Sequence, residues 1–276
     1  MTTQLALIQT SSSSDREENL KHTKNLICKA ADNGGNIICL QELFLSPYFC
    51  QFVDEKQFHL SESVPGPTTE KLGELAKQNE CVIIAPVFER QAAGIYYNTV
   101  AVLDADGSCL GKYRKMHIPE DPCFHEKYYF TPGDLGYKVF KTKFGTLGVL
   151  ICYDQWYPEA ARLTALQGAD ILIYPTAIGS LPHENKKTTS EYIDAWQTIQ
   201  RSHAIANGCF VASTNRVGIE DDIDFWGNSF VCGPFGQVIN KGGTNEEIIY
   251  AECNFDTIEP HRQNWPFFRD RRVDSY

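Results

Sequence analysis

The fold is decided by a stretch in the middle of the chain that reads Thr146-Leu147-Gly148-Val149-Leu150-Ile151-Cys152-Tyr153-Asp154-Gln155-Trp156-Tyr157-Pro158. Its first half is an apolar run of the kind that forms a strand buried on both faces. Polar residues follow directly, and Pro158 then occupies the position that proline favours, the first turn of a helix. We therefore predict a strand over 146–152, a turn, and a helix that ends near Gly168, which together form one unit of an α/β protein.

Strand-like and helix-like segments alternate over the rest of the chain. Further strands are expected at 5–9, 37–40, 82–88, 98–103, 110–114, 171–175, 210–215, 228–231 and 248–254. Further helices are expected at about 15–34, 67–78 and 189–207. No linker or low-complexity stretch divides the chain. Residues 1–276 are therefore predicted to form a single domain, with a mixed sheet or two sheets covered by helices.

Composition and charge exclude several classes of protein. The chain has 276 residues, of which 42% are hydrophobic and 22% are charged, and a formal net charge of −10. This charge argues against a nucleic-acid partner, because phosphates require a basic surface. No apolar run approaches the roughly 20 residues that span a bilayer, so no membrane association is expected. The first residues, Met1-Thr2-Thr3-Gln4, lack the basic region of a secretory signal, and we expect a cytoplasmic protein.

The ten cysteines form no Cys-x-x-Cys pair, and the seven histidines do not cluster with one another or with cysteines. Most of the cysteines stand in apolar contexts, where free cysteine packs as a small hydrophobic side chain. A thiol redox protein fits the number of cysteines but lacks the pair of nearby thiols that such proteins use. The sequence therefore predicts neither a metal site nor a cofactor.

Three residues carry candidate chemistry. Cys152 follows its strand directly and is either a nucleophile at a strand-to-helix turn or a buried packing residue. Glu42 stands among Leu40, Leu43 and Phe44, where burial raises a carboxyl pKa toward the range that suits proton transfer, unless the group is a structural ion pair. Lys115, taken alone, fits a solvated basic strand end. A base, a cation and a thiol are together what acyl transfer through a thioester requires.

Taken together, three segments resemble the signatures of the nitrilase superfamily of carbon–nitrogen hydrolases: Gln41-Glu42-Leu43-Phe44, Tyr113-Arg114-Lys115-Met116-His117 and Gly148-Val149-Leu150-Ile151-Cys152-Tyr153-Asp154. Their order and spacing also match. The resemblance implies that Glu42 is the general base, Lys115 stabilises the intermediate and Cys152 is the nucleophile. Many members carry a second glutamate between the lysine and the cysteine, and Glu126 occupies that place, unless it is a surface residue of a loop.

The resemblance also implies an architecture. Members have a four-layer α-β-β-α sandwich and assemble into dimers or larger homo-oligomers, without cofactors or metals. Residues 265–272, Trp-Pro-Phe-Phe-Arg-Asp-Arg-Arg, combine aromatic residues with both signs of charge. We therefore expect the tail at about 257–276 to make subunit contacts rather than to form a disordered end.

Longer stretches at 152–162, 174–180 and 265–272 resemble the branch of the superfamily that acts on carbamoyl amines. Relatives that bind carbamoyl amino acids need an arginine for the carboxylate. Here Asp154 follows Cys152 instead, and Glu184, Glu191 and Asp194 stand in a segment that is either part of the pocket or a solvated surface. The substrate-binding residues are predicted to be Tyr153 (through its backbone N–H), Asp154, Trp156 and Glu184.

The predicted partner is thus a small carbamoyl-amine substrate. The alternatives are an amidase of the same superfamily that acts on N-carbamoyl-β-alanine or a short-chain amide, and a catalytically silent relative that serves in binding or assembly. The silent relative is disfavoured because Glu42, Lys115, Glu126 and Cys152 are all present.

Overall fold

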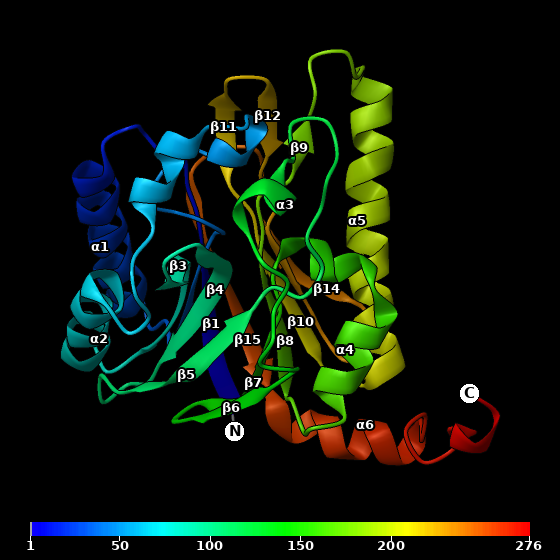
Figure 1. The fold of residues 1–276 in the computed structure, drawn as a ribbon. Coiled ribbons are helices and arrows are strands. Elements are labelled where there is room, and N and C mark those ends of the chain that lie inside the picture. The colour runs from blue at the N-terminus through cyan, green and yellow to red at the C-terminus, as the bar shows by residue number, and fades with distance from the viewer. Residues whose placement is uncertain (1) are drawn as a thin grey trace.

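Two six-stranded sheets lie face to face in the middle of the molecule (Figure 1). The computed structural model describes residues 2–276. The strand order of the first sheet is β15 (Glu247–Asn254), β1 (Thr2–Gln9), β2 (Ile37–Leu40), β3 (Val82–Ala92), β4 (Ile95–Leu103) and β5 (Cys109–Arg114). Strands β1, β2 and β3 are parallel to one another, and the remaining pairs are antiparallel.

The second sheet repeats this plan. Its strand order is β14 (Val238–Lys241), β13 (Phe230–Cys232), β10 (Phe210–Thr214), β8 (Ile171–Pro175), β7 (Gly145–Val149) and β6 (Val139–Thr142). Strands β10, β8 and β7 are parallel, and their neighbours are antiparallel. A separate three-stranded ribbon joins β11 (Val217–Glu220), β12 (Ile223–Trp226) and β9 (Gly179–Ser180).

Helices cover the outer face of each sheet. The first sheet carries α1 (Arg16–Asp32) and α2 (Pro67–Gln78), and the second carries α4 (Pro158–Ala165) and α5 (Lys186–Asn207) (Figure 1). Two shorter helices are α3 (Glu126–Tyr129) and α6 (Ile258–Asn264). Short 3₁₀ segments are η1 (Phe49–Gln51), η2 (Glu55–Leu60), η3 (Cys152–Trp156), η4 (Phe255–Thr257) and η5 (Val273–Ser275). The predicted four-layer sandwich is confirmed.

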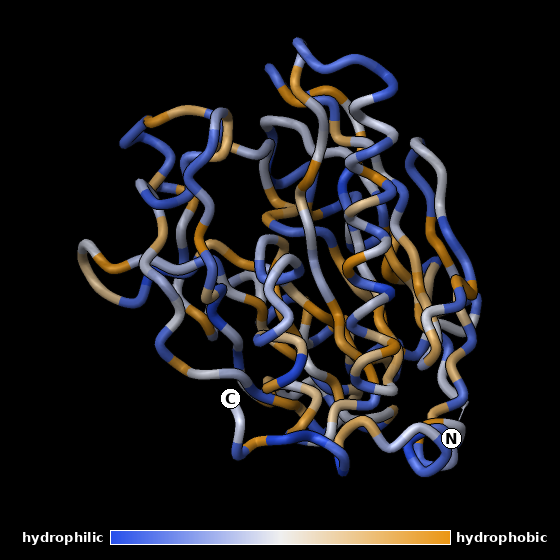
Figure 2. The backbone as a smooth tube through the Cα atoms, turned by 90° about the vertical axis from the view of Figure 1, so that its right-hand side faces the viewer, coloured by the Kyte–Doolittle hydropathy of each residue, from blue (hydrophilic) through white to orange (hydrophobic). Residues whose placement is uncertain are grey.

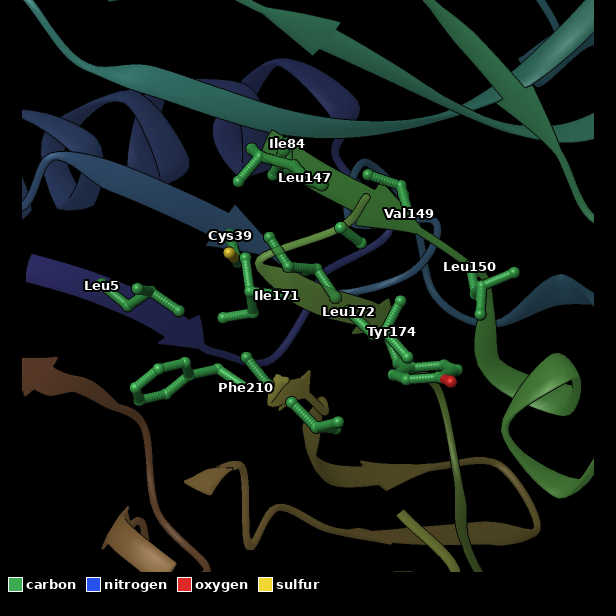
Figure 3. Close-up of a cluster of buried hydrophobic side chains, with 14 of the residues drawn as sticks. Leu5, Cys39, Ile84, Leu147, Val149, Leu150, Ile171, Leu172, Tyr174 and Phe210 are labelled. Atoms are coloured by element: carbon green, nitrogen blue, oxygen red, sulfur yellow. The ribbon is translucent and has the colours of Figure 1, made fainter. Parts of the chain in front are cut away.

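The main core fills the space between the sheets. Figure 3 shows Leu5, Cys39 and Ile84 of the first sheet facing Leu147 and Ile171 of the second. All five side chains are fully buried. Along the tube of Figure 2, hydrophobic residues gather on the strands, whereas hydrophilic stretches predominate in the outer loops.

Successive residues of β1 serve different cores because strand side chains alternate between faces. Leu5 and Leu7 belong to the core between the sheets, whereas Ala6 and Ile8 pack with residues of α1 and α2. This double burial explains why the strand is continuously apolar. The two sheets pack into one body. Within each sheet the three central strands are parallel, so they end at the same edge of that sheet.

Several predicted boundaries need correction. Helix α4 ends at Ala165 instead of near Gly168, and α5 begins at Lys186, where Asn185 accepts hydrogen bonds from the N–H groups of Lys187 and Thr188. Gly208 ends α5 with a left-handed φ of 55°, as its position predicts. Strands β6, β9, β11, β12 and β14 and helices α3 and α6 are not among the predicted elements.

Candidate active site

Four side chains of the predicted catalytic set meet between the two sheets. Glu42 lies two residues after β2, Lys115 directly follows β5, Glu126 begins α3 and Cys152 begins η3, just beyond β7. Glu42, Lys115 and Glu126 are fully buried, and Cys152 is 7% exposed. The first sheet therefore supplies Glu42 and Lys115, while the second supplies Cys152.

Lys115 is the centre of this cluster. Its Nζ donates a hydrogen bond to Glu42 Oε1 at 2.8 Å and to Glu126 Oε2 at 2.7 Å. Asn98 Nδ2 donates to Glu42 Oε1 at 2.7 Å, and the Tyr48 hydroxyl donates to Glu126 Oε1 at 2.6 Å. One buried cation is thus held between two carboxylates, an arrangement that fixes all three side chains.

Burial and neighbouring charges set the protonation states. Burial opposes the charge on Lys115, but the carboxylates of Glu126 and Glu42 raise the pKa of Lys115 well above its usual value. Burial raises the pKa of Glu126 to about 7, although Lys115 opposes that rise. Glu42 Oε2 is buried and has no hydrogen-bond partner among residues 2–276. The second oxygen of Glu42 is therefore free to accept a proton.

The nucleophile turn is strained at Cys152. Its φ of 43° lies in the left-handed region, which a residue with a Cβ adopts only when its surroundings hold it there. Burial raises the pKa of the Cys152 thiol well above its usual value, the charge of Glu42 adds to this rise, and Lys115 opposes it. The resting residue is accordingly a thiol that needs a base.

Asp154 holds this turn and does not face the cavity. Its Oδ2 accepts hydrogen bonds from the Ile151 N–H at 3.0 Å and the Tyr113 hydroxyl at 2.8 Å. Its Oδ1 accepts from the backbone N–H of His117 at 3.0 Å and lies 2.7 Å from His117 Nδ1. The carboxylate is fully buried and fully engaged. The prediction that Asp154 binds a substrate ammonium is therefore wrong.

A cavity of about 280 Å³ reaches Cys152. Its wall is mostly apolar and aromatic and includes Phe124, Trp156, Tyr192 and Trp226. Its charged lining residues are all acidic: Asp121, Glu126 and Glu184. No arginine, lysine or histidine of the described chain lines it. The cavity thus favours a small ligand with an apolar part and a cationic group.

The structure sorts the other predicted substrate-binding residues. Tyr153, Trp156 and Glu184 all line the cavity. Glu191 and Asp194 do not line it; both are exposed on α5, and Glu191 lies 3.8 Å from Lys187.

Sequence reasoning missed Asp121, whose carboxylate forms no hydrogen bond or ion pair with the rest of 2–276. The available signal was its place in Pro119-Glu120-Asp121-Pro122, a rigid loop between Lys115 and Glu126.

Within residues 2–276, no three histidine, cysteine or acidic side chains are grouped so that they could bind a metal ion. No helix in that range is both long and apolar enough to cross a membrane.

Comparisons with known proteins agree with this geometry. The family model described as carbon-nitrogen hydrolase matches residues 4–263. An N-carbamoylputrescine amidase of Solanum lycopersicum is 43% identical over 99% of this chain and 93% of its own. A citrullinase of Francisella tularensis is 39% identical over 99% of this chain and 96% of its own. The crystal structure of a carbon-nitrogen hydrolase from Helicobacter pylori G27 is 44% identical in sequence and superposes with a TM-score of 0.97. The match covers 99% of this chain and 97% of that one.

Proposed function

The chain belongs to the carbon-nitrogen hydrolase family, and we propose that it hydrolyses N-carbamoylputrescine to putrescine, ammonia and carbon dioxide, as a step of polyamine synthesis. Its similarity to N-carbamoylputrescine amidases over nearly the full length of both chains supports this substrate. The location that we infer is the cytosol, a compartment that keeps thiols reduced, and all ten cysteines are free.

The observation that carries the proposal is the charge of the cavity. N-carbamoylputrescine has a ureido group at one end and an ammonium group at the other. The cavity combines the nucleophile Cys152 with Asp121 and Glu184, and no basic residue of the described chain lines it. N-carbamoyl-β-alanine and citrulline both carry a carboxylate, which a cavity wall with acidic and no basic residues disfavours.

The first half of the mechanism forms a thioester. The free oxygen of Glu42 takes the thiol proton of Cys152 as the sulfur attacks the ureido carbon. Charge develops on the ureido oxygen, where the Lys115 ammonium and the backbone N–H of Tyr153 stabilise it. Glu42 returns the proton to the leaving nitrogen, so ammonia departs and a carbamoyl thioester remains on Cys152.

The second half releases the product. Glu42 takes a proton from water while the water oxygen attacks the thioester carbon, and that proton returns to the departing sulfur. The product is a carbamate, which decomposes to putrescine and carbon dioxide. Glu126 contributes by holding Lys115 through two hydrogen bonds. The reaction therefore needs only residues of this chain and water.

The test is steady-state ammonia release from N-carbamoylputrescine, with N-carbamoyl-β-alanine and citrulline in parallel and Cys152→Ala as the blank. We expect strong preference for the cationic substrate and no turnover by the variant. Preference for either carboxylate substrate would overturn the assigned substrate and leave the chemistry, whereas ammonia release by Cys152→Ala would overturn the mechanism.

We also propose a homo-oligomer, at least a dimer, whose contacts involve the tail at about 257–276. Trp265 in this tail is 50% exposed, and its ring lies 5.3 Å from that of Phe235, which is 49% exposed. Phe267 extends the same apolar area, with its ring 6.0 Å from that of Trp265. A second copy of the chain would remove these aromatic side chains from water.

A further inference from the structure

A buried ion pair outside the catalytic set touches the segments that carry both glutamates. Arg216 directly precedes β11, and Glu220 ends that strand. Arg216 Nη1 lies 2.7 Å from Glu220 Oε1 and 2.9 Å from Oε2. The Arg216 guanidinium is fully buried and Glu220 is 8% exposed. Neither residue lines the cavity or belongs to the cluster around Lys115.

One arm of the pair reaches Glu42. Arg216 Nη2 donates to the carbonyl oxygens of Glu42 at 2.9 Å and Leu43 at 3.0 Å, and Nη1 donates to Ser46 O at 3.1 Å. Leu43 has a φ of 51°, a left-handed conformation that is unfavourable for leucine. The rigid fork of the guanidinium therefore fixes the strained turn that aims Glu42.

The other arm reaches Glu126. Glu220 Oε2 accepts a hydrogen bond from the Tyr48 N–H at 2.6 Å, and the Tyr48 hydroxyl donates to Glu126 Oε1 at 2.6 Å. The Tyr48 ring is 1% exposed and packs 5.9 Å from the ring of Phe225 in β12. Glu220 thus fixes the backbone position of Tyr48, and the Tyr48 hydroxyl in turn orients Glu126.

The same ribbon also forms part of the cavity wall. Gly179 of β9 and Trp226 of β12 line the cavity, and β11 pairs with β12 over its whole length. In Figure 1 this ribbon stands beside the 3₁₀ segments that follow the Glu42 loop. A shift of the ribbon would accordingly move both glutamates and the cavity wall together.

From these contacts we infer that Arg216 and Glu220 form a positioning pair that aligns both glutamates with Cys152, acting on Glu42 through its backbone and on Glu126 through Tyr48. The inference rests on the catalytic roles proposed above for the two glutamates. It does not depend on which amide is the substrate.

Tyr48→Phe tests the arm to Glu126. In the wild type, the hydrogen bond that the Tyr48 hydroxyl donates lowers the pKa of Glu126. The variant keeps the packed ring but removes this bond, so the pKa of Glu126 should rise. The charged and titratable groups that face Glu126 are Lys115, Glu42, Tyr48, Cys50 and Cys152. Only the Tyr48 contribution changes, so the acidic limb of the kcat/KM profile should move to higher pH. An unmoved limb would overturn this arm.

Arg216→Lys tests the arm to Glu42. Lysine keeps the buried charge opposite Glu220 but lacks the fork that reaches all three carbonyl oxygens. We expect kcat to fall by about 10- to 100-fold, with KM within about threefold, because small misalignments of catalytic groups carry costs of this size. Far-ultraviolet circular dichroism and thermal melting establish that the variant is folded.

Arg262→Lys is the matched control. Arg262 also donates to backbone carbonyls, those of Asn207 at 3.2 Å and Ala169 at 3.3 Å, at the far end of the second sheet. It should leave kcat unchanged. An Arg216→Lys variant that is folded and loses no more activity than this control would overturn the positioning role.

A second readout separates this inference from the proposed substrate. Alkylation of Cys152 by iodoacetamide, quantified by peptide mass spectrometry, needs the base but no amide substrate. Slower alkylation in Arg216→Lys than in Arg262→Lys supports the positioning pair even if the wild type releases no ammonia from N-carbamoylputrescine. Equal alkylation rates in the two variants would contradict it.

Discussion

At the scale of single residues, the most informative group is Glu126, a buried carboxyl whose pKa is raised to about 7. When Glu126 is ionised, the Lys115 ammonium lies between two carboxylates, those of Glu42 and Glu126. When Glu126 is protonated, one of these two negative charges is lost. Because an acid is ionised above its pKa, activity should rise with pH through about 7.

This predicts an acidic limb in the profile of kcat/KM between pH 5 and 9. Glu126→Gln should lose that limb and most of the activity, since the amide cannot balance the ammonium. Glu159→Gln, at an exposed position of α4, is the control and should reproduce the wild-type profile. A wild-type profile that is flat from pH 5 to 7 would exclude Glu126 as the group that governs it.

The acids at the cavity wall give a second prediction. Asp121→Asn and Glu184→Gln should each raise KM for N-carbamoylputrescine by roughly 10- to 100-fold, the range expected when a charge-assisted hydrogen bond of about 1.5–3 kcal/mol is lost. N-pentylurea, in which a methyl group replaces the ammonium at the same chain length, serves as the matched substrate. Its KM should not change; an equal rise for both substrates would show that these acids shape the wall instead of binding charge.

Sequence reasoning singled out Glu42 and Cys152 because each follows an apolar strand, whereas Lys115 and Glu126 were identified only through the resemblance to a known family. The roles of these four residues stay predictions. The same reasoning failed at Asp154, since a residue two positions after the nucleophile is equally able to face the cavity or to turn back under it. Only the donors Tyr113 and His117, 41 and 37 residues away, decide between the two orientations.

At the scale of elements, the turn between β7 and α4 depends on Asp154. Asp154→Asn keeps the shape but places an amide against N–H and O–H donors, and a buried group left without its partner costs about 1–3 kcal/mol. We expect a lower melting temperature and a fall in kcat of roughly 100-fold through misalignment of Cys152.

Tyr113→Phe is the comparison for this turn, since it removes one donor of four and leaves the bond from Ile151 intact. It should have a smaller effect on both quantities. A larger effect of Tyr113→Phe than of Asp154→Asn would place the critical contact at the tyrosine.

The end of β5 depends on a close approach by Gly133. Its N–H donates to Lys115 O at 2.8 Å, and a Cβ there would lie 2.1 Å from Arg114 O. Gly133→Ala must therefore push the strand end that carries Lys115, with a stability cost of about 1–3 kcal/mol and a loss of kcat. Gly243→Ala is the control, because its Cβ would meet only Glu247 Oε1 at 3.6 Å. Equal melting temperatures and activities in the two variants would contradict this reading of Gly133.

Three of the strands that sequence reasoning missed, β6, β11 and β14, share a physical cause. All four residues of β14 are exposed, and β11 has exposed residues at its centre, so neither shows a buried apolar run or a simple alternation. Strand β6, likewise, has only one buried residue, Phe140. Strands of this kind form because a neighbour offers hydrogen bonds, and local sequence does not encode that neighbour.

At the scale of the whole molecule, sequence pattern alone left open one mixed sheet or two, and the resemblance to known carbon–nitrogen hydrolases decided between them. The pairing of β1 with β15 joins residues far apart in the sequence, such as Thr3 and Cys253, which are 250 positions apart. Long-range pairing of this kind depends on which hydrophobic faces meet. An apolar run in the sequence indicates only that a strand is buried, and not which strand it pairs with.

The oligomer gives a prediction at this scale. Trp265→Ala should shift the mass measured by sedimentation velocity toward the monomer, because it removes the most exposed aromatic side chain of the proposed contact with Phe235 and Phe267. Leu110→Ala, an exposed apolar residue of β5, is the control and should leave the mass unchanged. A Trp265→Ala protein with wild-type mass would place the subunit contact elsewhere.

The placement of Cys152 on one sheet and of Glu42 and Lys115 on the other has a consequence for the order of events in folding. The cluster of these three side chains does not exist in either sheet by itself and forms only when the two sheets dock. In a refolding experiment, secondary structure can therefore return before turnover does. The rate at which amide hydrolysis recovers would therefore report the rate at which the two sheets dock. Enzyme activity would thus serve as a probe of the last stage of folding.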